Sequence, residues 1–256
     1  MKNAQDKKLK NFPKYRIWKL GDQRLAQGDA RDVDLVNGLV GSVKIDAIVS
    51  DPPYGISVVE SKADFMPLKM NKVIANDNIS SEPEYATFTK DWLAPIVARL
   101  SKKNSIYIFN SDKMLFGLKA GMDQANVRFS QLVIWVKNHA VIGRKDYLPQ
   151  HELIVFGWYG SHVFRRSKDK SVLFYPKPNK SPFHPTTKPL DLIRHLVLNS
   201  TEMGGTVYDP FCGSGTTLLA CEQLKRRCFA IEQDSEYCQT IIRRWEAMTK
   251  LKAKPL

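Results

Sequence analysis

Residues 51–54, "DPPY", place an acid, two prolines and an aromatic ring directly after the apolar run 45–50. Pro52 and Pro53 have fixed φ angles and cannot donate a hydrogen bond, so this turn presents carbonyl oxygens without a competing N–H. Asp51 adds a carboxylate and Tyr54 a flat ring. The four residues are either a set of acceptors for a ligand or a simple turn that stops a buried strand.

A second motif, "VYDPFCGSGTTLLA" over residues 207–220, predicts a strand, a glycine turn and a helix. Gly213 and Gly215 allow a close approach of ligand to backbone, and the helix N-terminus offers free N–H groups to an anion. No lysine follows Gly215, which excludes a P-loop, and Leu218 is a poor match to the dinucleotide fingerprint. The remaining ligand is S-adenosylmethionine, with its ammonium facing Asp209 and its carboxylate facing the helix.

Glu232 ends the next expected strand, about twenty residues after the glycine turn. An acid at this point is well placed to accept both hydroxyls of a ribose. The alternative is that Glu232 only caps the following helix.

The elements that must position these motifs alternate between strand and helix. A hairpin is expected around Gly21-Asp22. Strands are expected over residues 44–51, 105–110, 128–137, 151–159, 205–210 and 227–234. Helices are expected over residues 31–40, 84–100, 112–125, 186–200, 215–225 and 235–250, and residues 160–183 as an irregular basic segment. The alternation predicts an α/β fold with a mostly parallel sheet, helices on both faces and ligands at the carboxyl ends of the strands.

Charge and composition favour a polyanionic partner. The 256 residues carry a formal charge of +13, and the first twenty residues hold seven Lys or Arg against Asp6 alone. We infer nucleic acid as the partner, although a solvated basic surface is the alternative. No apolar run approaches the roughly 20 residues of a membrane span. Four cysteines without a CxxC pair make zinc and disulfides poor expectations and fit a reducing cytoplasm.

Together, "DPPY" and "DPFCGSGTT" resemble the DNA amino-methyltransferases. The order of the motifs, with "DPPY" first, resembles the circularly permuted beta group of that family. Three further segments resemble its motifs: "QGDA" (27–30), "LVIWVKN" (132–138) and "HPTTKPLDLI" (184–193). The resemblance implies a Rossmann-like class I methyltransferase fold with a seven-stranded, mostly parallel, permuted sheet, in one domain over residues 1–256.

The resemblance also implies roles for residues at matching positions. Asp51, Pro52, Pro53 and Tyr54 would be catalytic, with Tyr54 stacked on an extruded base. The residues implied to bind S-adenosylmethionine are Asp29, Ala30, Asp51, Thr186, Lys188, Asp209, Phe211, Gly213, Ser214, Gly215, Thr216, Glu232 and Gln233. The residues expected to bind DNA are Lys137, Arg144, Lys145, Arg165, Arg166, Lys168 and Lys170. No metal is expected.

The implied reaction is methylation of the N6 amine of a flipped-out adenine in double-stranded DNA, in a bacterial or phage-encoded cytoplasmic protein. N4-cytosine methylation is the nearest alternative. Methylation of RNA or of a protein glutamine, and an inactive DNA-binding protein, are further alternatives. We expect a short basic target-recognition insert at about 158–183, a mobile loop at about 55–83, and a homodimer or a cognate restriction enzyme as further partners.

Overall fold

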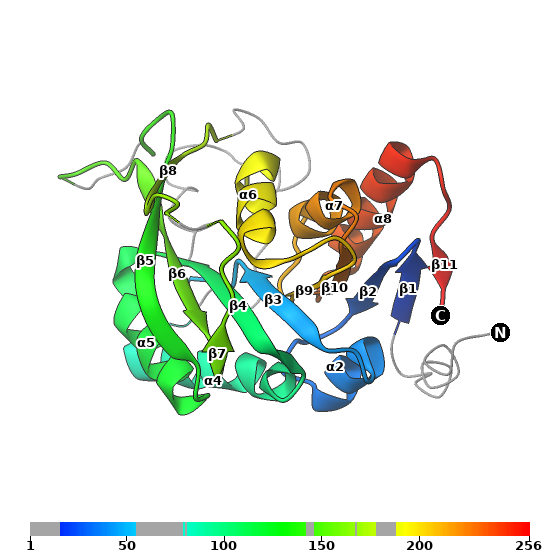
Figure 1. The fold of residues 1–256 in the computed structure, drawn as a ribbon, viewed down its shortest axis with the longest axis horizontal. Helices are drawn as coiled ribbons and strands as arrows, with labels where there is room; N and C mark the ends of the chain where they lie inside the picture. Colours follow the sequence, from blue (N-terminus) through cyan, green and yellow to red (C-terminus); the bar gives the residue numbers. More distant parts are fainter. Residues whose placement is uncertain (1–15, 55–78, 80, 142–145, 167, 178–187) are drawn as a thin grey trace.

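The computed structural model describes residues 16–54, 79, 81–141, 146–166, 168–177 and 188–256. Within these residues, eleven strands form one sheet with helices on both faces (Figure 1). The strand order is β11-β1-β2-β10-β9-β3-β4-β6-β5-β8, and β7 pairs with β4 outside this path.

The seven strands of the expected fold lie side by side in the middle of this order. Strands β2, β10, β9, β3 and β4 are parallel, and β6 runs antiparallel between β4 and β5. The strands are β1 (Arg16–Leu20), β2 (Gln23–Gln27), β3 (Ile45–Ser50), β4 (Leu100–Asn110), β5 (Arg128–Val136), β6 (His151–Trp158), β7 (Ser161–His162), β8 (Val172–Phe174), β9 (Thr206–Asp209), β10 (Arg227–Glu232) and β11 (Lys254–Pro255).

Helices cover the two faces of the sheet in two groups (Figure 1). The helical segments are α2 (Val33–Val40), α4 (Glu82–Val97), the 3₁₀ turn η1 (Asp112–Met114), α5 (Leu115–Gln124), α6 (Leu190–Ser200), α7 (Thr216–Gln223) and α8 (Ser235–Thr249). Leu35, Trp92 and Leu118 of α2, α4 and α5 pack into one core, and α6, α7 and α8 pack into the other. Each face of the central strands is therefore shielded from water, as a parallel sheet requires.

Strand pairing explains the permuted order of the motifs. Strand β3, which leads into "DPPY", pairs in parallel with β9, which leads into the glycine turn, with Ile48 opposite Tyr208. These strands are about 160 residues apart in the chain but adjacent in the sheet. The two motifs therefore lie side by side in the sheet although they are far apart in the sequence.

The structure differs from the sequence-based expectations mainly at the edges. The segment expected to be irregular after residue 160 contains β7 and β8, and β8 pairs in parallel with β5. Strand β11 adds a further short edge by pairing with β1. Helix α4 begins at Glu82, capped by Ser81, so the expected loop 55–83 ends two residues early. The rest of that loop, apart from residues 79 and 81, and the insert beyond residue 177 lie outside the described residues.

Candidate active site

Four neighbouring parallel strands bring acidic residues to one edge of the sheet. Asp51 follows β3, Asp209 ends β9 and Glu232 ends β10. Asp29 lies two residues beyond β2, whose last residue, Gln27, pairs with Glu232. The two sequence motifs therefore meet at the carboxyl edge, where open α/β sheets bind ligands.

Asp51 accepts hydrogen bonds from two side chains at this edge of the sheet. The Tyr54 hydroxyl donates to Asp51 Oδ1 at 2.5 Å, and Lys188 Nζ donates to Asp51 Oδ2 at 2.5 Å. Lys188 also donates to the Tyr54 hydroxyl at 3.3 Å, and its ammonium lies 5.5 Å from the centre of the Tyr54 ring. "DPPY" and the "HPTTKP" segment are thus joined through Lys188. The neighbouring Thr186 lies outside the described residues.

Glu152, the second residue of β6, extends this cluster and was not expected from the sequence. Its Oε1 lies 2.8 Å from Lys137 Nζ, and its Oε2 lies 3.2 Å from Lys188 Nζ. The Tyr54 hydroxyl oxygen lies 3.4 Å from the same Oε2, while its proton is donated to Asp51. The sequence gives one weak signal, an acid at the start of a strand whose next five residues are buried.

Burial and charge pull the pKa values of this cluster in different directions. Burial raises the pKa of Asp51 above its usual range, although Lys188 opposes the shift. Burial alone would also raise the pKa of Glu152, but Lys188 and Lys137 outweigh it and lower that pKa to about 2. Burial would lower the pKa of Lys188, but Asp51 and Glu152 outweigh it and raise it. Glu152 and Lys188 are therefore charged at neutral pH.

The glycine turn after β9 has the geometry of a ligand cradle. Gly213 and Gly215 have φ of 54° and 88°, a region that side chains rarely adopt. A Cβ at Gly215 would also lie 3.0 Å from Ile241 Cγ1. The backbone N–H of Phe211 donates to Asp209 Oδ1 at 3.1 Å, which fixes the carboxylate at the start of the turn.

Glu232 holds the same turn from the next strand. Its Oε2 accepts from the Gly213 N–H at 2.7 Å and its Oε1 from the Asp234 N–H at 2.8 Å. The cap of helix α8 is Asp234, whose side chain accepts from Glu236 N and Tyr237 N. Glu232 is therefore not the helix cap that the sequence left open as an alternative.

Asp209 and Glu232 are acids in an environment that disfavours their charge. Burial is the largest cause, and it raises the pKa of each carboxyl to about 7. Asp209 is only 3% exposed. Among the described residues, no cation is one of the main groups that shift the pKa of either carboxyl, and a ligand ammonium would supply one. Together with the glycine cradle, this donor and acceptor set fits S-adenosylmethionine.

The wall beside the turn is aromatic. The Phe211 ring lies 5.7 Å from Phe88 and 5.6 Å from Trp92, both on α4. On the other side, Asp29 accepts from Arg31 through both carboxylate oxygens, with Nη2 to Oδ2 at 2.6 Å. Asp29 therefore has an internal partner already, and a ligand here would face a paired carboxylate.

The remaining residues expected at the cofactor site lie around the same edge. Ser214 and Thr216 are buried, with Ser214 O accepting from the Arg244 guanidinium. Ala30 is buried beyond β2, whereas Gln233 is exposed beyond Glu232.

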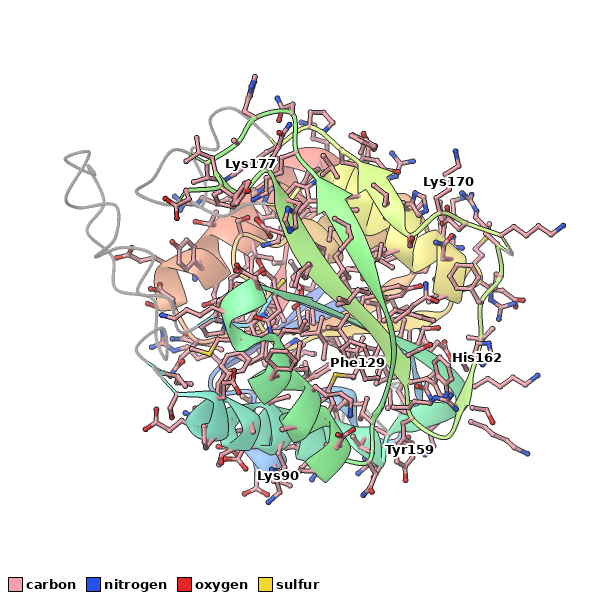
Figure 2. The ribbon with its side chains drawn as sticks, turned by 90° about the vertical axis from the view of Figure 1, so that its left-hand side faces the viewer. Lys90, Phe129, Tyr159, His162, Lys170 and Lys177 are labelled. Atoms are coloured by element: carbon pink, nitrogen blue, oxygen red, sulfur yellow. The ribbon has the colours of Figure 1, made fainter. Side chains whose placement is uncertain are left out.

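The residues expected to bind DNA fall into three groups. Lys137 is 5% exposed and paired with Glu152, so it belongs to the buried cluster and not to an outer surface. Arg144 and Lys145 lie outside the described residues. The exposed residues are Arg165, Arg166, Lys168 and Lys170. Figure 2 shows Lys170 at the same end of the molecule as Lys177, opposite Lys90.

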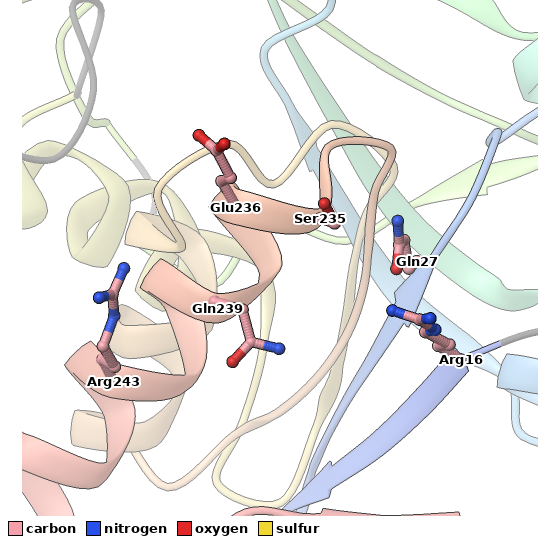
Figure 3. Close-up of a pocket in the computed structure, with 6 residues that line it drawn as sticks. All are labelled: Arg16, Gln27, Ser235, Glu236, Gln239 and Arg243. Carbon is pink, nitrogen blue, oxygen red and sulfur yellow. The ribbon is translucent and has the colours of Figure 1, made fainter.

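A cavity of about 390 Å³ lies elsewhere, between α8 and the first hairpin (Figure 3). It is lined by Arg16, Gln27, Ser235, Glu236, Gln239 and Arg243. None of the expected site residues lines it. The candidate active site is instead defined by the contacts at the carboxyl edge.

Within the described residues, no helix is long and apolar enough to cross a membrane. No group of three or more His, Cys, Asp and Glu is arranged to hold a metal ion within that part of the chain. All four cysteines are buried as free thiols.

Comparison with known proteins gives consistent matches. The family model of the DNA methylases (N6_N4_Mtase) matches residues 45–182 and 158–243. The type II methyltransferase M.HpaI of Haemophilus parainfluenzae is 25% identical over 221 residues, which are 76% of this chain and 66% of that protein. The crystal structure of an M1.HpyAVI–SAM complex has a TM-score of 0.63 and 25% identity, covering 86% of this chain and 98% of that one. The PvuII DNA methyltransferase, described as cytosine-N4-specific, has a TM-score of 0.65 at 15% identity, covering 85% and 84%.

The family match covers far more than half of the chain and includes both motifs that meet at the carboxyl edge. The solved structures add a common fold, that of the class I methyltransferases, over 85–86% of this chain. By its sequence, its fold and the residues gathered at its sheet edge, the chain belongs to the DNA methylase family of N6/N4 amino-methyltransferases.

Proposed function

We propose that this protein transfers a methyl group from S-adenosylmethionine to the N6 amine of adenine in double-stranded DNA. The observation that carries the proposal is the contact of "DPPY" with Lys188 at the edge where Asp209 and Glu232 also end their strands. The acceptor cluster and the cofactor cradle are thus adjacent. The choice of adenine depends on the resemblance, in which an Asp-first tetrapeptide favours adenine over cytosine.

The chemistry explains why acceptors are needed. The lone pair of an exocyclic amine is delocalised into the ring of the base, which makes the amine a poor nucleophile. Asp51 and the carbonyl of Pro52 accept hydrogen bonds from its two N–H groups and so favour a pyramidal nitrogen with a localised lone pair. Because alignment does most of the work, a strong base is not needed.

The cofactor supplies an electrophilic methyl group when it is bound. Asp209 would accept from its ammonium, and Glu232 would accept from its ribose hydroxyls. Phe211, Gly213 and Gly215 would border its methionine end. Asp29 would face the adenine end beside Arg31, which already holds that carboxylate in place.

Lys188 is proposed here to hold Asp51. The resemblance implies a place for Lys188 near the methionine carboxylate, whereas its ammonium contacts Asp51, Glu152 and Tyr54. In this role Lys188 keeps Asp51 ionised, which an acceptor requires.

The target amine cannot be reached inside a duplex, so the base must leave the stack. Stacking on Tyr54 would offset part of that cost, since base–aromatic stacking is worth about 1–3 kcal/mol. The exposed Arg165, Arg166, Lys168 and Lys170 would contact the phosphates.

The test is a methyl-transfer assay on DNA with tritiated S-adenosylmethionine, followed by digestion and separation of the nucleosides. Label in N6-methyladenine is the expected result. Label in N4-methylcytosine would overturn the choice of base, and cofactor binding without transfer to DNA would overturn the activity.

A further inference from the structure

Glu152 joins two buried lysines from different parts of the chain. Lys137 follows β5, and Lys188 precedes α6, yet both ammonium groups lie within 3.2 Å of a Glu152 oxygen. The side chains of the two lysines are 4% and 6% exposed, and that of Glu152 is 18% exposed. This degree of burial sets the group apart from ordinary surface ion pairs.

The charges alternate along a chain of four residues. The order is Lys137, Glu152, Lys188 and Asp51, and each neighbouring pair is in contact. Removing one member of a buried ion pair leaves an uncompensated charge, while the pair as a whole adds little net stability. The arrangement is therefore better explained by a need to position its members than by stability.

Lys188 is shared unequally between the two carboxylates. Its ammonium lies 2.5 Å from Asp51 and 3.2 Å from Glu152. Without the Glu152 charge, Asp51 would be the one carboxylate in contact with Lys188 among the described residues. The full charge of Lys188 would then fall on Asp51, which would make its oxygens weaker acceptors for a neutral amine.

We propose that Glu152 is a positioning residue that shares Lys188 with Asp51 and thereby leaves Asp51 able to accept the N–H of the target amine. This inference deepens the proposed function and rests on it. Glu152 acts through Lys188, which contacts both Asp51 and the Tyr54 hydroxyl, and the Glu152 Oε2 also lies 3.4 Å from that hydroxyl, whose one proton is donated to Asp51. A misplacement of about 1 Å at such a site can cost on the order of 100-fold in rate.

The sign of the pH effect follows from the charges. The groups that face Glu152 among the described residues are Lys137, Lys188, Tyr54 and Asp51. The Glu152 charge raises the pKa of Asp51 and also that of Lys188. Replacing Glu152 by a neutral residue should therefore lower both pKa values.

The experiment compares Glu152→Gln with wild type in single-turnover methyl transfer to DNA between pH 5 and 9. We expect the rate to fall about 10- to 100-fold. The acid limb of the profile should move to lower pH, because Asp51 then ionises at lower pH. Affinity for S-adenosylmethionine should stay within about threefold of wild type.

Glu222→Gln is the matched control. Glu222 is a half-buried acid that accepts from Gln23 and Trp245, both at 2.9 Å, far from the carboxyl edge. Its loss should lower the melting temperature without moving the acid limb. An equal response of the two variants, or a rate for Glu152→Gln within twofold of wild type, would overturn the inference.

A readout independent of catalysis separates this inference from the proposed function. NMR of ¹³C-lysine-labelled protein, assigned with a Lys188→Arg variant, reports the pKa of Lys188 directly. That pKa should fall in Glu152→Gln even if wild type fails to methylate DNA. An unchanged pKa would reject the role of Glu152. If Glu152→Gln does not fold, Glu152→Asp takes its place, since it keeps the charge. Its transfer rate should fall without a shift of the acid limb of the pH profile. A wild-type rate for Glu152→Asp would count against the proposal.

Discussion

Asp51 has both of its carboxylate oxygens engaged before any substrate is present. The Tyr54 hydroxyl occupies Oδ1 and Lys188 occupies Oδ2. Each oxygen can accept a second hydrogen bond, so the target amine can join these donors. The hydroxyl also holds the Tyr54 ring beside the acceptor, where a flipped base would stack.

Tyr54 therefore combines two roles that substitution can separate. Tyr54→Phe keeps the ring and removes the hydroxyl, so we expect a loss of transfer rate below tenfold. Tyr54→Ala also removes the stacking surface, worth about 1–3 kcal/mol, which corresponds to about 5- to 150-fold. The measurement is single-turnover transfer, together with 2-aminopurine fluorescence at the target position as a report on base extrusion. Equal losses in both variants would show that the ring does not stack on the base.

Asp51 itself should be indispensable. Asp51→Ala removes an acceptor from the amine and leaves Lys188 without its nearest carboxylate. We expect transfer to fall below detection in the tritium assay, while the protein still melts cooperatively. Readily measurable transfer by a folded Asp51→Ala protein would contradict the proposed role.

The two acids of the cofactor cradle predict a pH dependence of binding. The folded-state pKa values of Asp209 and Glu232 are raised to about 7, above the usual range of carboxyl groups. The folded apoprotein therefore binds more protons than the unfolded chain, so its stability should decrease as pH rises from about 4 to 7. Ionised carboxylates are needed to accept from an ammonium and a ribose.

Affinity for S-adenosylmethionine should therefore increase between pH 6 and 8 and then level off. Calorimetric titration across this range measures the effect directly. Glu232→Gln should weaken binding and flatten the dependence. A pH-independent affinity in wild type would show that neither acid changes its charge on binding.

Sequence patterns located these residues because each follows a strand within one local motif. Asp51, Asp209 and Glu232 were all predicted at strand ends, and the structure brings them to one edge. Glu152 has only a weak local signal, because it lies at the start of its strand and not at the end. Its partners are Lys137, fifteen residues earlier, and Lys188, thirty-six residues later, so their contact depends on tertiary packing.

At the scale of elements, alternating periodicity predicted the central strands and helices to within about five residues. The largest difference is at β4, which begins at Leu100 although the expected helix extended to residue 100 and the expected strand began at 105. Strand β8 was missed because Val172–Phe174 is too short for a periodic signal, and its partner β5 lies more than thirty residues away. The pairing gives the basic insert a fixed place along β5. The insert is thus more ordered over residues 168–177 than its composition indicated.

A polar cluster fixes the insert to α6. Asp169 contacts His195 and also accepts from Asn199 Nδ2 at 2.6 Å. The Tyr175 hydroxyl lies 2.7 Å from His195 Nδ1 on the other side of the ring. Lys168 and Lys170 flank Asp169 and are exposed, so the cluster determines where these lysines are presented.

Asp169→Asn should weaken DNA binding about three- to tenfold although it removes a negative charge from the proposed DNA-binding surface. The loss of a negative charge alone would strengthen DNA binding. A weaker affinity would therefore show that Asp169 positions the lysines. Asp191→Asn is the control, since it removes one negative charge from an exposed side chain on α6, the helix that Asp169 contacts. Fluorescence anisotropy with labelled DNA gives both affinities. Tighter binding by both variants would show that the cluster does not position the lysines.

At the scale of the whole molecule, the net charge of +13 predicts strongly salt-dependent DNA binding. Each neutralised phosphate contributes about 0.9 to the slope of log K against log salt for duplex DNA. Replacing Lys168 and Lys170 by Gln should reduce the magnitude of that slope by up to about 2. An unchanged slope would place the DNA elsewhere on the surface.

The same distribution of charge limits the DNA sequence specificity that we expect of the protein. Phosphate contacts fix position and register, but sequence is read by contacts to base edges. The expected recognition insert spans only about 158–183, and its exposed arginines and lysines suit phosphates. We therefore expect a short recognition site or relaxed specificity. Sequencing of methylated bases after expression in a methylation-free host tests this, with the Asp51→Ala protein as the control for background. One long motif shared by every modified site would contradict the expectation, and would place base-reading side chains outside the described part of the insert.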